Sequence, residues 1–156
     1  MPYVSPDNTV LAFDALDDSV PAVRIIDRTC SDLDAASRHY GTLIQSIRMV
    51  SCRGNNVWAP QKRRHSTAAV GMDGAGRFLM IHCRAPFSTH DLIEILLDLP
   101  LAIESAMYVE GGPEAQLFVD AGGVEREFVG SFESGILESD LNRIGWPIPN
   151  VIAFED

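Results

Sequence analysis

Apolar residues in this chain fall into short runs separated by turn-forming residues, and this pattern predicts a protein built mainly of strands. The runs occupy residues 9–13, 22–26, 42–51, 67–72, 78–83, 106–109, 116–119, 127–129 and 151–154. Apolar runs of this length bounded by Gly, Pro, Asn or Asp are typical of β-strands. We therefore expect strands to dominate the fold.

Two glycine-containing turns predict β-hairpins. The first, Asp-Gly-Ala-Gly at residues 73–76, lies between two of the apolar runs. The second, Ala-Gly-Gly at residues 121–123, separates another pair. Both supply residues that tolerate the positive φ angles of tight reversals, so each turn is expected to join antiparallel neighbours.

One helix is predicted clearly and a second one weakly. Ser88 and Asp91 form a capping-box-like Ser-x-x-Asp, and apolar residues at helical spacing follow in residues 92–97. Pro100 ends this helix, because the residue before a proline is pushed out of the α region. A shorter helix is possible at residues 137–143.

These elements together predict an α/β (α+β) fold with a mixed, strand-rich sheet, β-hairpins and one or two packed helices. No repeat or composition shift marks a linker, so we expect a single domain over residues 1–156. Residues 53–65 contain Gly, Asn, Trp and Pro and read as a loop. Its length indicates a functional segment rather than a simple connection.

Composition supports a globular protein and disfavours several classes of partner. Of the 156 residues, 46% are hydrophobic and 22% are charged, as in ordinary globular chains. The formal charge of −10 would repel a phosphate backbone, so nucleic acid is not an expected partner. The basic run at residues 62–65 is the local exception, either a solvated loop or an anion site.

No membrane span or targeting segment is expected. The apolar stretch at residues 92–107 is interrupted by acidic residues and a proline, and falls short of the length that a spanning helix needs. The first residues lack a basic start followed by an apolar run. The protein would be periplasmic or secreted if a signal has been removed from a precursor, and cytoplasmic otherwise.

The cysteines predict at most one disulfide and no metal site. Cys30 and Cys52 both flank predicted strand edges and are the favoured pair in an oxidising compartment, while Cys83 lies in an apolar strand and reads as core. Their spacing does not suit zinc, and the acidic cluster at residues 14–18 lacks a calcium-loop spacing. We predict no cofactor or metal.

The most informative segment is the turn Glu110-Gly111-Gly112-Pro113-Glu114 after an apolar strand. Paired glycines allow a ligand or another backbone to approach closely, and proline fixes the direction of the chain. Two nearby carboxylates can divide acid and base or nucleophile roles, because like charges push their pKa values apart. A tight hairpin turn with two exposed acids is the simpler interpretation, and the spacing leaves both open.

The order of several motifs resembles the phosphodiester glycosidase family, the group that contains the uncovering enzyme of the lysosomal mannose 6-phosphate pathway and many bacterial relatives. The motifs are Thr-Ala-Ala-Val-Gly-Met-Asp at 67–73, Gly-Arg-Phe-Leu-Met-Ile at 76–81, Leu-Ile-Glu-Ile-Leu-Leu at 92–97, Ala-Met-Tyr-Val-Glu-Gly-Gly at 106–112 and Pro-Asn-Val-Ile-Ala at 149–153. The resemblance runs from about Leu43 to the C-terminus, and residues 1–42 match the pattern poorly. Family members typically have Asp-Gly-Gly-x-Ser at the turn, and usually have an arginine where Ser66 stands.

The resemblance implies a hydrolase that cleaves the bond between a sugar anomeric carbon and a phosphodiester oxygen, in glycan or envelope metabolism. It needs a carboxylate at the anomeric carbon and cationic donors for the phosphate. The implied catalytic residues are Glu110 and Glu114. The implied substrate-binding residues are Arg48, Arg64, His65, Gly111, Gly112 and Gln45.

Other interpretations remain open from the sequence. The chain could be an inactive relative that binds a glycan or a protein, or an unrelated small α/β domain. Arg48 could be an exposed strand residue, His82 a satisfied sheet histidine, and Trp58 and Trp146 either a sugar-stacking platform or core. An exposed sheet edge makes a homodimer possible. The active interpretation requires Glu110, Glu114 and a basic side chain to meet in one pocket.

Overall fold

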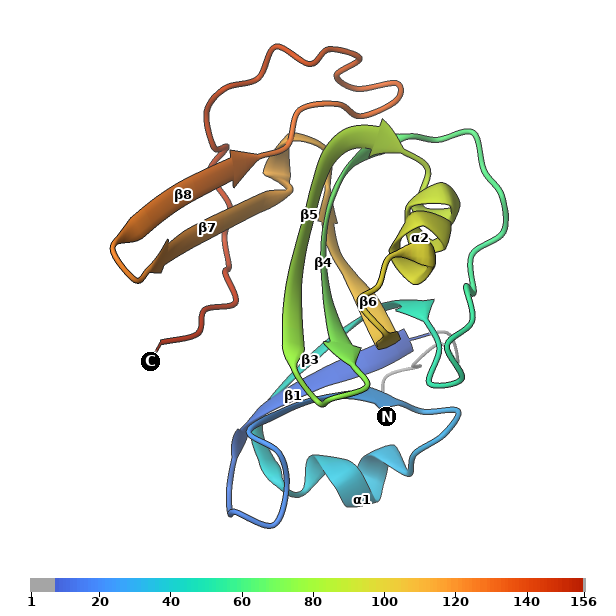
Figure 1. Cartoon of the computed structure of the whole chain (residues 1–156), viewed down its shortest axis with the longest axis vertical. Helices are drawn as coiled ribbons and strands as arrows, with labels where there is room; N and C mark the ends of the chain where they lie inside the picture. Colours follow the sequence, from blue (N-terminus) through green and yellow to red (C-terminus); the bar gives the residue numbers. More distant parts are fainter. Residues whose placement is uncertain (1–7, 156) are drawn as a thin grey trace.

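The computed structural model describes residues 8–155 and contains a six-stranded antiparallel sheet with a separate two-stranded hairpin (Figure 1). The sheet has the order β2-β1-β3-β6-β4-β5. Its strands are β1 (Asn8–Ala15), β2 (Val23–Asp27), β3 (Tyr40–Val50), β4 (His65–Asp73), β5 (Phe78–Phe87) and β6 (Ile103–Gly111), and the hairpin consists of β7 (Gln116–Ala121) and β8 (Val124–Val129). The helical elements are α1 (Leu33–Ser37), α2 (Thr89–Asp98) and the short 3-10 helix η1 (Gly112–Glu114). The predicted strand-rich α+β fold in a single domain is confirmed.

Both predicted hairpins form. At the β4–β5 turn, the Asp73 carboxylate accepts the backbone N–H groups of Ala75 at 3.0 Å and Arg77 at 2.8 Å, which closes the reversal. β7 and β8 pair antiparallel around the Gly-Gly turn. β6 returns from α2 and inserts between β3 and β4, so the Gly111–Gly112 turn lies at the end of an interior strand.

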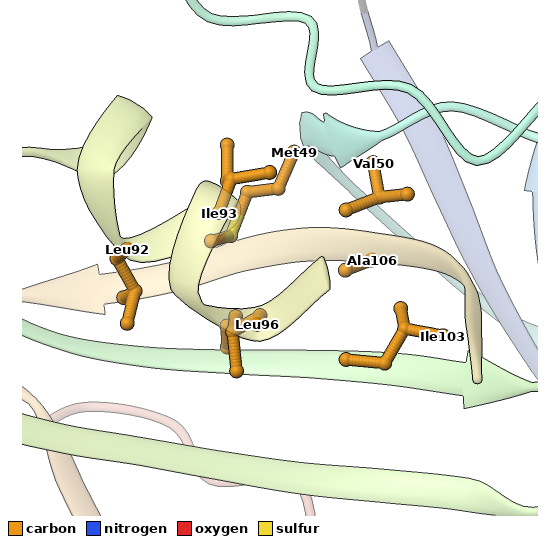
Figure 2. Close-up of a cluster of buried hydrophobic side chains, with 8 residues drawn as sticks. Met49, Val50, Leu92, Ile93, Leu96, Ile103 and Ala106 are labelled. Carbon is orange, nitrogen blue, oxygen red and sulfur yellow. The ribbon is translucent and has the colours of Figure 1, made fainter. Parts of the chain in front are cut away.

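Helix α2 covers the central strands, as its apolar spacing predicts. The Ser88 hydroxyl accepts from the backbone N–H of Asp91 at 3.1 Å and caps the first turn. Leu92, Ile93 and Leu96 point from α2 into a cluster with side chains of β3, β4 and β6, several of which are drawn in Figure 2. Burial of this apolar stripe fixes the helix on the sheet.

The predictions of a helix at residues 137–143 and of a strand at residues 151–154 are wrong, and α1 was not predicted. Residues 137–143 form no helix: the Leu137 carbonyl accepts from the Glu133 N–H at 2.8 Å and the Ser139 carbonyl from the Ser131 hydroxyl at 2.7 Å, where a helix would use the N–H groups of residues 141 and 143. Residues 151–154 form no strand, although the Phe154 ring packs 4.6 Å from that of Phe78. α1 is a single short segment whose sequence lacks a full amphipathic pattern.

The predicted Cys30–Cys52 disulfide is present and joins the segment after β2 to the end of β3. Asp27 reinforces the same junction, since its carboxylate accepts from the Cys52 backbone N–H at 2.9 Å and pairs with Arg48 at 2.9 Å. Hydrogen bonds from backbone N–H groups, more than offsetting burial, keep the pKa of Asp27 below its ordinary value. Cys83 is a partly buried free thiol at the edge of the α2 core.

We expect Cys52→Ser to lower the free energy of unfolding by roughly 3 kcal/mol, because the bridge closes a loop with a sequence separation of 22 residues and restricts the unfolded chain. Urea unfolding of the oxidised protein measures the change. Cys83→Ser is the matched control and should cost much less. Equal midpoints for the Cys52 variant and the unaltered protein would contradict the expectation.

No helix within residues 8–155 has the length and apolar character needed to cross a membrane.

Candidate active site

The Gly111–Gly112 turn ends β6 in a crowded setting. A Cβ on Gly111 would collide with the Tyr108 hydroxyl and lie 2.9 Å from Nδ1 of His65. Gly112 has a φ of +67°, and its Cβ would lie 2.6 Å from a carboxylate oxygen of Glu133. The glycines therefore allow close approach, as the sequence predicts, and here the approaching groups are side chains of this chain.

A β-bulge at Val109 sets the direction of the residues before the turn. Tyr108 pairs with Ala69 and Glu110 pairs with Ala68, so two residues of β6 advance while β4 advances by one. The exposed Glu110 carboxylate folds back at the strand end and accepts from the Gly111 backbone N–H at 2.9 Å.

His65, the first residue of β4, is buried beneath this turn and held on both ring nitrogens. Nδ1 lies 3.0 Å from the Ser66 carbonyl oxygen and 3.1 Å from Oγ1 of Thr67, and Nε2 lies 3.4 Å from Oγ1 of Thr89 on α2. A carbonyl oxygen can only accept, so Nδ1 carries a proton in this arrangement. The ring meets Tyr108 edge-on, with centroids 5.8 Å apart.

Tyr108 is a site residue whose pKa is strongly shifted by its surroundings. Burial raises the pKa of its hydroxyl well above the ordinary value, and the nearby carboxylates of Glu110, Glu133 and Glu114 raise that pKa further against the opposing effect of Arg63. The phenol consequently stays protonated and can donate a hydrogen bond at neutral pH.

Glu133 reaches the turn because the segment after β8 pairs with the start of β4. The Ser66 N–H donates to the Phe132 carbonyl at 2.9 Å, and the Ser134 N–H donates to the Arg64 carbonyl at 2.9 Å. Glu133, whose side chain is 14% exposed, forms an ion pair with Arg63, whose side chain is 61% exposed. The pair brings a cation to the rim of the site.

A cavity of about 220 Å³ opens beside these groups. It is lined by Ile47, Trp58, Gln61, Arg63, His65 and Tyr108. The Trp58 indole N–H donates to the Arg48 carbonyl at 2.7 Å, which fixes the ring against β3 and 6.4 Å from the Tyr108 ring. One wall is thus aromatic and apolar, and the other offers an amide, an imidazole and a guanidinium.

A family model for phosphodiester glycosidases matches residues 2–155. The chain belongs to the phosphodiester glycosidase family. The match includes the first part of the chain, where motif comparison found little similarity, and it excludes an unrelated domain with chance resemblance. No curated protein and no solved structure matches the chain.

The residues that the family resemblance implicated are distributed unevenly. His65 and Gly111 lie against Tyr108, and Gly112 lies against Glu133. Neither Glu110 nor Glu114 lines the 220 Å³ cavity, so the cavity does not bring both acids and a basic side chain together. The roles of all the implicated residues stay predictions.

Arg48 is held by Asp27 and by the Thr29 hydroxyl at 2.6 Å. Arg64 anchors the Ser134 hydroxyl through its backbone N–H at 3.0 Å, and Gln45 is exposed on β3. None of these three lines the 220 Å³ cavity.

Ser66 has a structural role at the position where relatives in the phosphodiester glycosidase family usually have an arginine. Its hydroxyl donates to the Arg84 carbonyl at 2.7 Å and accepts from the backbone N–H groups of Ser131 at 3.0 Å and Phe132 at 3.3 Å. These bonds seat the segment that carries Glu133, and Arg63 supplies a nearby guanidinium.

Sequence reasoning missed Arg63, Tyr108 and Glu133 as site residues. Arg63 stands in the basic run at 62–65, so charge pattern alone could have included it. Tyr108 lies two residues before Glu110 in β6, and the sequence does not reveal the bulge at Val109 between them. Nothing in the sequence around Glu133 marks it, because a backbone pairing distant in sequence brings it to the turn. Among the described residues, no group of three His, Cys, Asp or Glu side chains could hold a metal ion.

His82 supports the other end of the turn, and its Nε2–H donates to the Ala115 carbonyl at 3.1 Å. Burial lowers the pKa of His82 below its ordinary 6.5. The unfolded chain therefore binds a proton at a higher pH than the folded chain, so this contribution to stability is complete above about pH 6.5 and is lost as the pH falls.

We expect the unfolding free energy to decline as the pH falls below about 6.5, and His82→Gln to flatten that slope. Denaturant titrations at several pH values measure it, with the exposed His39→Gln variant as control. A slope that His82→Gln leaves intact would contradict the assignment.

Proposed function

We propose that this protein is a hydrolase that cleaves the bond between a sugar anomeric carbon and a phosphodiester oxygen. The observation that carries the proposal is the cavity lined by Trp58, Arg63, His65 and Tyr108, beside the Gly111–Gly112 turn of a phosphodiester glycosidase family member. The proposed substrate is a carbohydrate phosphodiester, for which the cavity offers an aromatic wall and cationic donors.

The reaction consumes one water and releases a phosphate monoester. The C1–O bond breaks and its electron pair stays with the phosphate oxygen, while the water oxygen ends on C1. The proton that water loses passes to a carboxylate and then to solvent. Because the leaving group is already a stable anion, it needs little protonation, and the main demand is stabilisation of positive charge at C1.

Glu110 is the proposed carboxylate at the anomeric carbon, with Glu114 as its partner. The Gly111 N–H orients the Glu110 carboxylate, so the side chain is held at the strand end rather than loose in solvent. The reacting bond would then lie at the end of β6, where the turn connects the two faces of the sheet.

Arg63 and His65 are the proposed contacts to the phosphate. Guanidinium groups bind phosphate oxygens by paired, charge-assisted hydrogen bonds, and Arg63, whose side chain is 61% exposed, lines the cavity. Gly111 and Gly112 keep the approach to the turn free of Cβ atoms. Trp58 supplies an aromatic surface on which a sugar face can pack.

The test is release of free sugar and phosphate monoester from an N-acetylglucosamine phosphodiester. We expect equal amounts of both products, and no release from the same sugar joined to a neutral alkyl alcohol. Absence of both products from a folded protein that nevertheless binds the substrate would overturn hydrolysis and favour a glycan-binding relative.

A further inference from the structure

A row of side chains on β3 is exposed although the strand lies inside the sheet. Leu43 and Ile47 are 46% and 44% exposed, and Gln45 between them is exposed as well. The alternate residues of this strand are half-buried, so the row occupies one face. We call Leu43, Gln45 and Ile47 the β3 row.

The β3 row leads directly into the site cavity. Ile47 lines that cavity together with Trp58 and Tyr108, both of which pack against the core beneath α2. At the other side, the β1 partners of Gln45 and Leu43 are Val10 and Ala12, which are buried. The row is therefore an open, uncharged track, with apolar side chains at both ends and the Gln45 amide between them, and its Ile47 end reaches the site.

Charge is arranged in a particular way along this track. The β3 row carries no formal charge, while Arg63, which also pairs with Glu133, lines the cavity in a chain whose formal charge is −10. A ligand that fits both features has an anionic group next to an extended apolar part. A free sugar matches neither feature, and a fully polar glycan leaves the apolar track unused.

We propose that the site takes phosphodiesters whose alcohol carries an alkyl or similar apolar chain, with the phosphate at Arg63 and the chain along the β3 row. The inference rests on the proposed function for the placement of the phosphate, and it adds the chemical class of the leaving group. Ile47 is the residue that determines this preference, because it belongs both to the cavity and to the row.

The size of the preference follows from partial burial of the chain. A fully buried methylene is worth about a fourfold gain in affinity, and a chain on an open track buries only one side. Octyl phosphate has about six more methylenes than ethyl phosphate, and half-burial of each is worth about twofold, so we expect octyl phosphate to bind about 60-fold more tightly.

The experiment uses these two alkyl phosphates as probes, with calorimetry on the full chain and octyl phosphate below its micelle concentration. Ile47→Ser should remove the difference between the probes. Leu141→Ser is the matched control, since Leu141 is 81% exposed and does not line the cavity. It should keep the preference.

The outcomes separate this inference from the proposed function, because binding needs no turnover. Equal affinity for the two probes in the unaltered protein would overturn the chain preference even if sugar release is observed. A preference that Ile47→Ser leaves intact would overturn the location on β3. A dimer that Ile47→Ser dissociates, without any chain preference, would assign the row to a second copy and overturn the proposal.

Discussion

Replacing Glu110 with Gln is expected to reduce release of sugar from an N-acetylglucosamine phosphodiester by about 10²- to 10⁴-fold, the range for loss of a positioned acid or base. The amide keeps the size of the side chain and can still accept from the Gly111 N–H, but it supplies no negative charge to the anomeric carbon. Initial rates at saturating substrate measure the effect.

The fold should tolerate this change because Glu110 is exposed. Thermal unfolding within a few degrees of the unaltered protein would establish that the loss is chemical. Glu104→Gln, an exposed acid toward the other end of β6, is the matched control and should retain activity. Turnover by the Glu110 variant equal to that of the control would remove Glu110 from the mechanism and leave Glu114 and Glu133 as the carboxylates to substitute next.

Gly130→Ala is expected to destabilise the fold by about 3 kcal/mol and to disturb the site together with it. A Cβ at this position would collide with the Gly112 carbonyl oxygen and lie 2.9 Å from the Ala115 carbonyl oxygen, and neither backbone atom can move independently. The Gly130 N–H also donates to the Ala115 carbonyl at 2.7 Å, so separation of the two segments breaks a hydrogen bond.

Gly54→Ala is the matched control, because it removes a glycine without placing the new Cβ against other atoms. Gly54 has a φ of +72° and nothing within 4 Å of an added Cβ, so only the left-handed conformation is penalised, by about 1 kcal/mol. Denaturant unfolding of the two variants gives the comparison. Similar losses in both would show that contact between Gly130 and the turn contributes little.

The site joins side chains that local sequence does not connect. Tyr108 and Glu110 come from β6, His65 from β4, Arg63 from the loop before it, and Glu133 from the segment after β8. Burial, with a further contribution from nearby carboxylates, raises the pKa of Tyr108, so its hydroxyl is protonated at neutral pH and can donate a hydrogen bond. Arg63 offsets part of the negative charge and keeps an anionic ligand acceptable.

The sequence by itself determined most of the local structure. Alternation and turn residues predicted the β4–β5 and β7–β8 hairpins, and the Ser88 cap with apolar spacing predicted α2, because these elements depend on neighbours in the chain. The disulfide pair and the family were also predicted from the sequence, because the ends of strands and the order of motifs can be recognised along the chain without knowledge of the fold. The crowded glycine pair was located for the correct physical reason.

Only the tertiary structure decided which residues share a site. The Glu133 N–H and the Ser131 hydroxyl take the Leu137 and Ser139 carbonyl groups that a helix at residues 137–143 would need, and a bulge at Val109 interrupts the pairing of β6 with β4. Glu133 reaches Gly112 through backbone pairing with β4. These outcomes depend on contacts between segments that are distant in the sequence. A local pattern of residues says nothing about the free energy of such contacts, so it predicted where the strands lie but not which side chains they bring together.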